Sequence, residues 1–105
     1  MTTKTIPKRF RINKGCAYSV VHVPTLRNGR ELARVFFEER LVKMARSAMG
    51  KRIGKRDKRY AFWHEVTHAI LHEMGNKLGR NEAFVTEFAD KLSGAIDSAR
   101  FDKNV

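Results

Sequence analysis

Residues 60–74 read YAFWHEVTHAILHEM, and this stretch decides the fold. Drawn as an α-helix, its apolar side chains cover a wide arc, so the sequence predicts a largely buried helix over these residues. Gly75 and Asn76 are expected to end this helix, because glycine and asparagine are common at helix C-termini. Asn81 is a suitable N-cap for a second helix, in which apolar residues recur at helical spacing from Phe84 to about residue 100.

The residues before the first helix favour β-strands and turns. Ala17–Val23 contains three valines and a tyrosine and predicts a strand. Arg27–Arg30 carries an Asn-Gly pair, which is typical of a turn. Arg34–Phe37 and Leu41–Ala45 predict a hairpin, because valine and phenylalanine prefer strands, although residues 32–48 could instead form one helix.

Several strands followed by two helices predict an α+β fold, in which two packed helices cover one face of a small antiparallel sheet. The 105 residues fit a single domain, residues 1–105, with a basic strand-and-loop half (1–59) and a two-helix half (60–100). Hydrophobic residues make up 42% of the chain and charged residues 31%, which indicates a folded protein and excludes a disordered one. No apolar run approaches the roughly 20 residues that a membrane-spanning helix needs.

The net charge of +11 is distributed unevenly along the chain. Residues 1–60 hold 17 Lys and Arg against 4 Asp and Glu, whereas residues 61–105 hold 5 against 7. Residues 49–59, which Gly50 and Gly54 mark as a loop, are especially basic. The basic residues of this loop are Lys51, Arg52, Lys55, Arg56, Lys58 and Arg59. Two interpretations stay open: a surface for weak nucleic-acid binding, and a solvated surface that keeps the protein soluble.

The single cysteine and the N-terminal segment bear on the compartment. Cys16 is the only cysteine, so no internal disulfide can form, which agrees with a reducing environment. Residues 1–14 are basic but lack the apolar stretch and cleavage site of a signal peptide. We therefore expect a cytoplasmic protein, with Cys16 packed in a strand rather than acting as a nucleophile.

Within the first helix, His64, Glu65 and His68 form an H-E-x-x-H pattern. One helical turn separates the two histidines, so both project from the same face and can reach one zinc ion. Glu65 projects beside the metal, where it can take a proton from a zinc-bound water and pass it to a leaving amine. The pattern therefore predicts two zinc ligands and a general base.

A catalytic zinc usually has a third protein ligand, and three residues further along the chain are candidates. His72 lies about 80° around the helix and about 12 Å along it from His64, so one ion cannot bind all three histidines of a straight helix. Glu82 lies in the first turn of the second helix, on the face expected to turn toward the first. Glu87 shares a face with Lys91 and is expected to be solvated, so Glu82 is the predicted third ligand.

Two segments of the chain resemble the metal-binding helices of one family. The segment Trp63–Gly75, WHEVTHAILHEMG, resembles the active-site helix of ImmA/IrrE-like zinc metallopeptidases, most of all that of short phage-encoded members. The segment Glu82–Ala89, EAFVTEFA, is similar to that family's second helix, which opens with a ligand glutamate and carries an apolar-Ala pair about two turns on. The resemblance covers roughly residues 60–100.

This resemblance implies a minimal zincin-like domain in the cytoplasm, that of the host cell if the chain is phage-encoded. It implies His64, His68 and Glu82 as the ligands of one Zn²⁺ and Glu65 as the catalytic base. The expected activity is hydrolysis of a peptide bond in a protein or peptide substrate. The alternative is a phage accessory protein that binds nucleic acid or a host factor and keeps a structural or vestigial zinc site.

Overall fold

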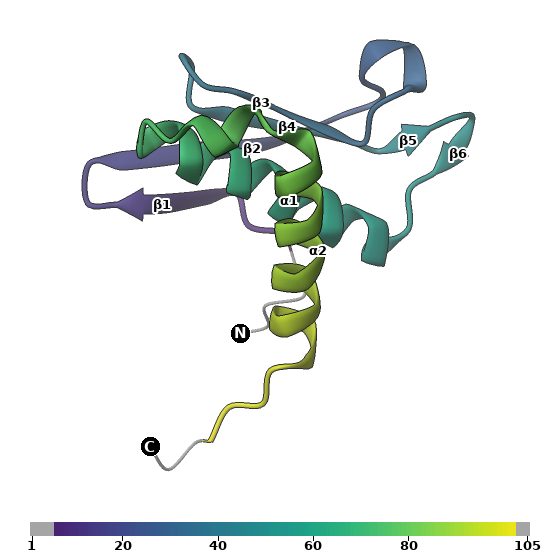
Figure 1. Cartoon of the computed structure of the whole chain (residues 1–105). Coiled ribbons are helices and arrows are strands. Elements are labelled where there is room, and N and C mark those ends of the chain that lie inside the picture. The colour runs from purple at the N-terminus through teal and green to yellow at the C-terminus, as the bar shows by residue number, and fades with distance from the viewer. Residues whose placement is uncertain (1–5, 103–105) are drawn as a thin grey trace.

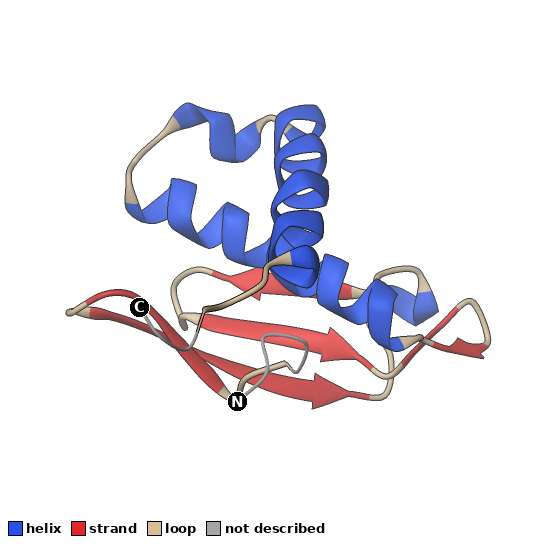
Figure 2. Cartoon of the chain, turned by 90° about the horizontal axis from the view of Figure 1, so that it is seen from below, coloured by secondary structure: helices blue, strands red, loops and turns tan. Residues whose placement is uncertain are grey.

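Four strands form one sheet, and both helices lie on the same side of it (Figures 1 and 2). The computed structural model describes residues 6–102, so the ends of the predicted domain, residues 1–5 and 103–105, lie outside the described residues. The four strands are β1 (Arg9–Asn13), β2 (Cys16–Val23), β3 (Ala33–Phe36) and β4 (Leu41–Ala45). The helices are α1 (Lys55–Glu73) and α2 (Glu82–Ser98). The predicted α+β class is confirmed.

The sheet is mixed, so the prediction of an antiparallel sheet is wrong. The strand order is β1-β2-β4-β3, with β2 and β4 parallel and the other neighbouring pairs antiparallel. The predicted hairpin is confirmed, because β3 pairs with β4 with Val35 opposite Val42. The parallel pair joins two strands that have β3 between them in the chain, and a nonlocal pairing of this kind leaves no turn signal in the sequence.

The predicted loop over residues 49–59 is also wrong. Two short strands form a hairpin here, β5 (Ser47–Ala48) and β6 (Lys51–Arg52). The hairpin turns at Met49 and Gly50, whose φ angles of 53° and 76° are left-handed. α1 then begins at Lys55, well before its predicted start. Residues 55–59 follow the last glycine before the helix and are mostly good helix formers, so their charge does not prevent helix formation.

The predicted Asn-Gly turn is present as a short 3-10 helix, η1 (Arg27–Gly29). Asn28 and Gly29 both have positive φ angles, 56° and 83°. The backbone N–H of Met49 donates a hydrogen bond to the carbonyl oxygen of Gly29 at 2.7 Å. The tip of the β5–β6 hairpin is therefore fixed to this turn and does not project alone.

The main core lies between the sheet and α1. Tyr18, Val42 and Met44 of the sheet have no exposed surface, and they share one cluster with Phe62 and Val66 of α1. Complete burial of an apolar side chain contributes about 1.5–3 kcal/mol, so this cluster anchors α1 on the sheet.

A polar contact at the other end of α1 adds to this anchor. The Tyr18 hydroxyl donates a hydrogen bond to Oε2 of Glu73, in the last turn of α1, at 2.7 Å. The guanidinium of Arg40 forms an ion pair with the other carboxylate oxygen of Glu73, Oε1, at 3.5 Å. Cys16, in the same strand as Tyr18, is buried with 4% exposure, so its predicted packing in a strand is confirmed.

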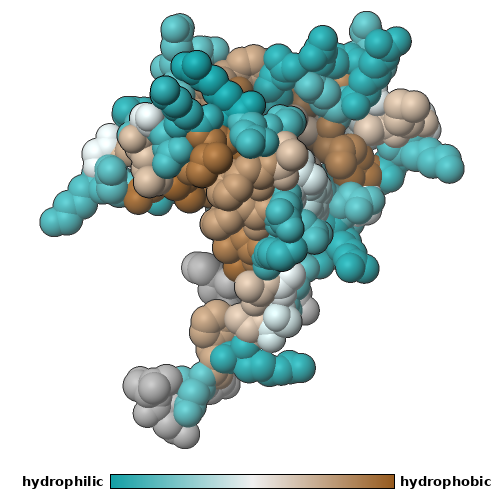
Figure 3. Space-filling view, viewed as in Figure 1, coloured by the Kyte–Doolittle hydropathy of each residue, from teal (hydrophilic) through white to brown (hydrophobic). Residues whose placement is uncertain are grey.

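The second helix packs on α1 and on η2 (Lys77–Arg80), the 3-10 helix between them. Asn81 caps α2 as predicted, because its side-chain oxygen accepts a hydrogen bond from the N–H of Phe84 at 3.1 Å. Val85 and Ala89 are fully buried, whereas Phe88 is 47% exposed and Figure 3 shows apolar surface along α2. Within residues 6–102, neither helix has the length and apolar character that crossing a membrane would need.

Candidate metal centre

His64, His68 and Glu82 come together where α1 faces the start of α2. Nε2 of His64 lies 2.9 Å from Oε1 of Glu82, and Nε2 of His68 lies 3.1 Å from the same oxygen. All three ligand atoms lie within 4.8 Å of one another, and the group could hold a metal ion. The two histidine side chains are largely buried, with 17% and 15% exposure, while Glu82 is 67% exposed. The site therefore opens to solvent on the α2 side.

A backbone carbonyl sets the protonation of His68. Nδ1 of His68 lies 2.9 Å from the carbonyl oxygen of Gly79, which can only accept a hydrogen bond, so Nδ1 carries a proton. In the neutral imidazole this leaves a lone pair on Nε2, aimed at a carboxylate oxygen that is itself an acceptor. Two acceptors at 3.1 Å need either a proton or a metal ion between them. A protein carbonyl on the far nitrogen is also the usual partner of a metal-binding histidine.

The approach of η2 to α1 depends on Gly79 having no side chain. A Cβ placed on Gly79 would lie 3.2 Å from Cβ of Leu71, closer than ordinary van der Waals contact. Glycine at this position lets the carbonyl of residue 79 reach His68, so Gly79 positions one member of the possible ligand group without belonging to it.

The electrostatics of Glu82 agree with a cation at this site. Its partial burial alone would raise its pKa, but the charge of His68 and hydrogen bonds from both imidazoles outweigh that effect. The pKa of Glu82 therefore lies below its usual range. The carboxylate is kept ionised, which is the form that binds metals.

Glu65 is buried between α1 and β3, with 9% exposure. Its Oε1 accepts a hydrogen bond from the backbone N–H of Val35 at 2.9 Å. Burial raises the pKa of this carboxyl to about 8, although the hydrogen bond from Val35 acts in the opposite direction. A divalent cation beside it would favour the carboxylate and lower this value.

The three possible ligands and Glu65 line one cavity of about 530 Å³, and the opposite wall is β3. Arg34 of β3 also lines it, with its guanidinium held by two hydrogen bonds of 2.9 Å to Glu31. These hydrogen bonds raise the pKa of Arg34 and lower that of Glu31. Neither residue was predicted from the sequence, since nothing local distinguishes this pair from other surface charges.

Three other polar residues lie near this cavity, and only one of them lines it. Tyr60 lines the same cavity, and its ring centroid lies 6.0 Å from that of His64. His72 is exposed and its ring stacks on Phe37 with centroids 4.1 Å apart, and it does not belong to the possible ligand group. Glu87 is exposed, as predicted, and it forms an ion pair with Lys91 at 3.4 Å.

His22 lies outside this cavity. Burial lowers its pKa, and the charges of Lys58 and Arg46 lower it further, which places it near the basic hairpin and not near the possible ligands.

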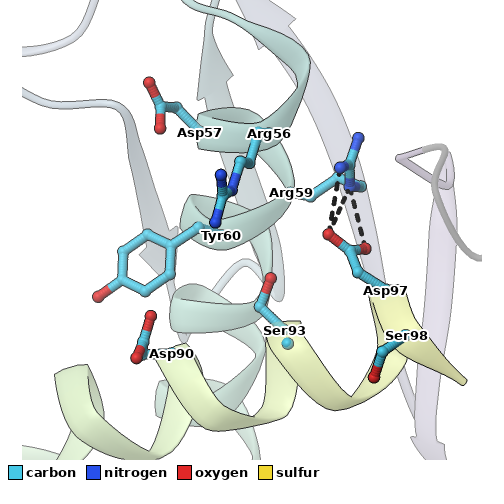
Figure 4. Close-up of a pocket in the computed structure, with 9 residues that line it drawn as sticks. Arg56, Asp57, Arg59, Tyr60, Asp90, Ser93, Asp97 and Ser98 are labelled. Atoms are coloured by element: carbon cyan, nitrogen blue, oxygen red, sulfur yellow. Dashed lines mark hydrogen bonds and ion pairs between the residues drawn. The ribbon is translucent and has the colours of Figure 1, made fainter.

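A larger cavity, about 720 Å³, lies elsewhere, between the first turns of α1 and the second half of α2 (Figure 4). Arg59 and Asp97 form a two-pronged ion pair there, with distances of 3.1–3.3 Å, and Arg56 lines the same cavity. Arg59 was predicted to be available for nucleic acid, but its charge is neutralised by Asp97 and its side chain is only 15% exposed. Among the six predicted basic residues, Arg59 therefore has a structural role.

Comparisons of this chain with protein-family models, with curated proteins and with solved structures find no match.

Proposed function

We propose that this protein is a zinc-dependent peptidase of the ImmA/IrrE type. The supporting observation is that three possible ligands, His64, His68 and Glu82, share one open cavity with a buried carboxyl, Glu65. A structural zinc site would need four protein ligands and would be closed. Three ligands with an exposed side instead suit a site that leaves a position for water or substrate.

The donor atoms fit zinc well. Two imidazoles and one carboxylate are among the ligand sets that catalytic zinc uses. Zinc-bound atoms at about 2.0–2.1 Å in a tetrahedral arrangement are about 3.4 Å apart. Nε2 of each histidine now lies 2.9–3.1 Å from Oε1 of Glu82, so each of these two pairs needs to separate by only a few tenths of an ångström to reach that spacing. Bound zinc would polarise a substrate carbonyl and lower the pKa of a coordinated water to about 7.

Glu65 is the residue that moves the proton in this proposal. One carboxylate oxygen is held by the N–H of Val35, which fixes the side chain against β3. The carboxylate takes a proton from the attacking water as the new C–O bond forms. It then gives that proton to the amide nitrogen as the C–N bond breaks, so that an acid and an amine leave and Glu65 is again ionised.

The free edge of β3 supports binding of an extended substrate. In an antiparallel pair, only every second residue bonds to the partner strand. Leu32 bonds to β4, because its carbonyl accepts a hydrogen bond from the N–H of Ala45. The backbone N–H and C=O groups of Ala33 and Val35 therefore turn away from β4. The N–H of Val35 faces Glu65. A peptide added along this edge would lie against the cavity that holds the three ligands, with its backbone bonded to β3.

Metal content and cleavage test this proposal separately. Elemental analysis of protein purified with zinc is expected to give about one zinc per chain. Incubation with a mixed peptide library, followed by mass spectrometry, is expected to show new termini with the wild-type protein. The Glu65→Gln variant should keep zinc and fold and lose cleavage by at least about 100-fold, since general-base catalysis contributes about 10²–10⁴-fold.

Glu87→Gln is the matched control, because Glu87 is an exposed acid of α2 paired with Lys91. It should retain both zinc and cleavage. Equal cleavage by wild-type and Glu65→Gln proteins would contradict the assigned base. A protein that takes up no zinc would contradict the whole proposal.

A further inference from the structure

The β5–β6 hairpin and its neighbours form a concentrated basic surface. The backbone joins three segments here: Met49 bonds to Gly29 of η1, and the N–H of Ile53 bonds to the carbonyl of Arg46 at 3.0 Å, just before α1 begins. We call this surface the basic end. Its cationic residues are Arg30, Arg46, Lys51, Arg52, Lys55 and Lys58. Figure 3 shows hydrophilic side chains over much of the rim where the hairpin lies.

The charges of the basic end are not neutralised by neighbouring acids. None of its six cations forms an ion pair with another residue of the described part of the chain, 6–102. Arg27 and Arg34, close by in the sequence, both pair with Glu31, and Arg59 pairs with Asp97. Asp57 is the acid in the first turn of α1, and it is exposed. The basic end therefore carries a strong positive potential.

Some of these cations lie where they weaken the fold. Lys55 and Lys58 are in the first turn of α1, at the positive end of the helix dipole, where a cation is unfavourable. Gly54 caps this helix without a side-chain hydrogen bond. Charges that only kept the protein soluble could lie anywhere on its surface. Their placement at a cost to stability is better explained by an anionic partner.

The rigidity of the basic end also favours a partner. The hairpin turns through two residues, and its tip is bonded to η1 at 2.7 Å. Its cations are thus presented on a fixed backbone, so less freedom is lost when they bind. Met49 is 79% exposed, and it is the only large apolar side chain exposed in this hairpin. One such side chain offers little apolar area for a lipid surface.

We propose that the basic end binds the phosphodiester backbone of double-helical nucleic acid. Lys and Arg contacts to phosphates carry no sequence information, so binding is independent of base sequence. The described residues of the hairpin include no aromatic side chain for stacking on unpaired bases, so duplexes bind better than single strands. This surface donates no ligand to the candidate metal centre, so its function does not rest on the proposed peptidase activity.

Fluorescence anisotropy with a labelled 20-base-pair DNA duplex and a matching RNA duplex tests the proposal. The dissociation constant should be about 10⁻⁴–10⁻⁶ M near physiological salt, and affinity should fall by about 100-fold or more between 50 and 200 mM salt. Replacing two phosphate-contacting cations, as in Lys51→Ser with Arg52→Ser, should weaken binding by about 10-fold or more. It should also lower the slope of log affinity against log salt by about 2.

A charge-matched control removes two cations outside the basic end, Lys77→Ser with Lys91→Ser, both on exposed residues. This control should change the affinity and the salt slope far less than the hairpin variant. No duplex binding at 50 mM salt overturns the proposal, as does an equal loss in both double variants. A preference for single strands, for vesicles with 30% phosphatidylserine, or for polyglutamate over the duplexes at equal charge also overturns it.

Discussion

The charged groups of the candidate metal centre and those of the basic end differ in burial and in hydrogen-bond partners. At the candidate metal centre, His68 has a carbonyl on one nitrogen and a carboxylate on the other, and Glu65 is held by a backbone N–H. At the basic end, cations such as Lys51 and Arg52 are exposed and form no ion pair within residues 6–102. Partnered, part-buried groups control both geometry and stability, whereas exposed ones control only the surface potential. Substitutions should therefore have large effects in the first region and small ones in the second.

The largest effect is expected for His68→Ala. This change removes a possible ligand that is 15% exposed and leaves Glu82 with one imidazole partner. Zinc content should fall from about one per chain to near zero, and added zinc should no longer raise the melting temperature, since a bound metal stabilises only the folded state. Elemental analysis and thermal unfolding with and without zinc measure both.

His72→Ala is the control for the ligand test. His72 lies one turn further along α1 and stacks on Phe37, outside the possible ligand group. This variant should keep zinc and the zinc-dependent rise in melting temperature. If His72→Ala lost zinc as His68→Ala does, the ligand assignment would be wrong.

Gly79→Ala should have the next largest effect. The new Cβ would lie 3.2 Å from Cβ of Leu71, so η2 and α1 must separate by a few tenths of an ångström, which draws the Gly79 carbonyl away from Nδ1 of His68. Loss of such a partner typically weakens metal binding 10–100-fold, and we expect about 10-fold in a zinc competition titration. Gly94→Ala is the control, because a Cβ there meets no atom within 4 Å among the described residues and should leave zinc affinity unchanged.

Gly79 also illustrates where prediction from the sequence stops. That Glu82 faces His64 and His68 could be predicted because helical spacing and the Asn81 cap fix which face it shares, and both are local properties. The role of Gly79 depends on how closely η2 approaches Leu71, which is a tertiary distance. The hydrogen bond from Val35 to Glu65 likewise joins residues 30 apart in the chain.

In the sheet and in residues 49–59, too, some features could be predicted from neighbouring residues and others could not. The β3–β4 hairpin was predictable from neighbouring residues, but the parallel pairing of β2 with β4 was not, because the strands are not consecutive. Residues 55–59 were predicted to belong to a loop because Gly50 and Gly54 precede them in a strongly basic segment, yet they form the first turns of α1. Charge limits helix formation weakly where no glycine or proline interrupts the segment.

A smaller, pH-dependent effect on the free energy of unfolding is expected at Glu73, in the last turn of α1. Hydrogen bonds from Tyr18 and Cys16, with the charge of Arg40, hold the pKa of Glu73 below its usual range. This contribution to stability is complete above the ordinary carboxyl pKa of about 4.5 and is lost as pH falls through the lowered pKa of the folded state.

The Glu73→Gln variant tests this contribution. It should be less stable than the wild type at pH 7, and the difference should shrink as the pH falls below about 4. Urea unfolding of both proteins at several pH values measures it. A difference that stays constant down to pH 2 would show that the charge of Glu73 contributes nothing.

The smallest effect is expected for Met49→Asn at the tip of the hairpin. Met49 has a φ of 53°, a left-handed conformation that costs an ordinary residue about 1 kcal/mol and that asparagine adopts more readily. The variant should gain about 0.5 kcal/mol in the free energy of unfolding, measured with urea. Met74→Asn is the control, because Met74 is also exposed, at 66%, but has a φ of −78° and no such strain to relieve.

The Met49→Asn variant also tests whether the methionine side chain itself contacts the nucleic acid. If the basic end contacts only phosphates, Met49→Asn leaves every cation in place and should bind a DNA duplex as tightly as the wild type. If Met49 instead inserts between base pairs, as apolar wedges of bending proteins do, binding should weaken while the salt slope stays the same. A gain in stability with unchanged binding would place the strain in the turn alone. A loss of binding would show that the hairpin keeps an exposed, strained methionine because it contacts the nucleic acid.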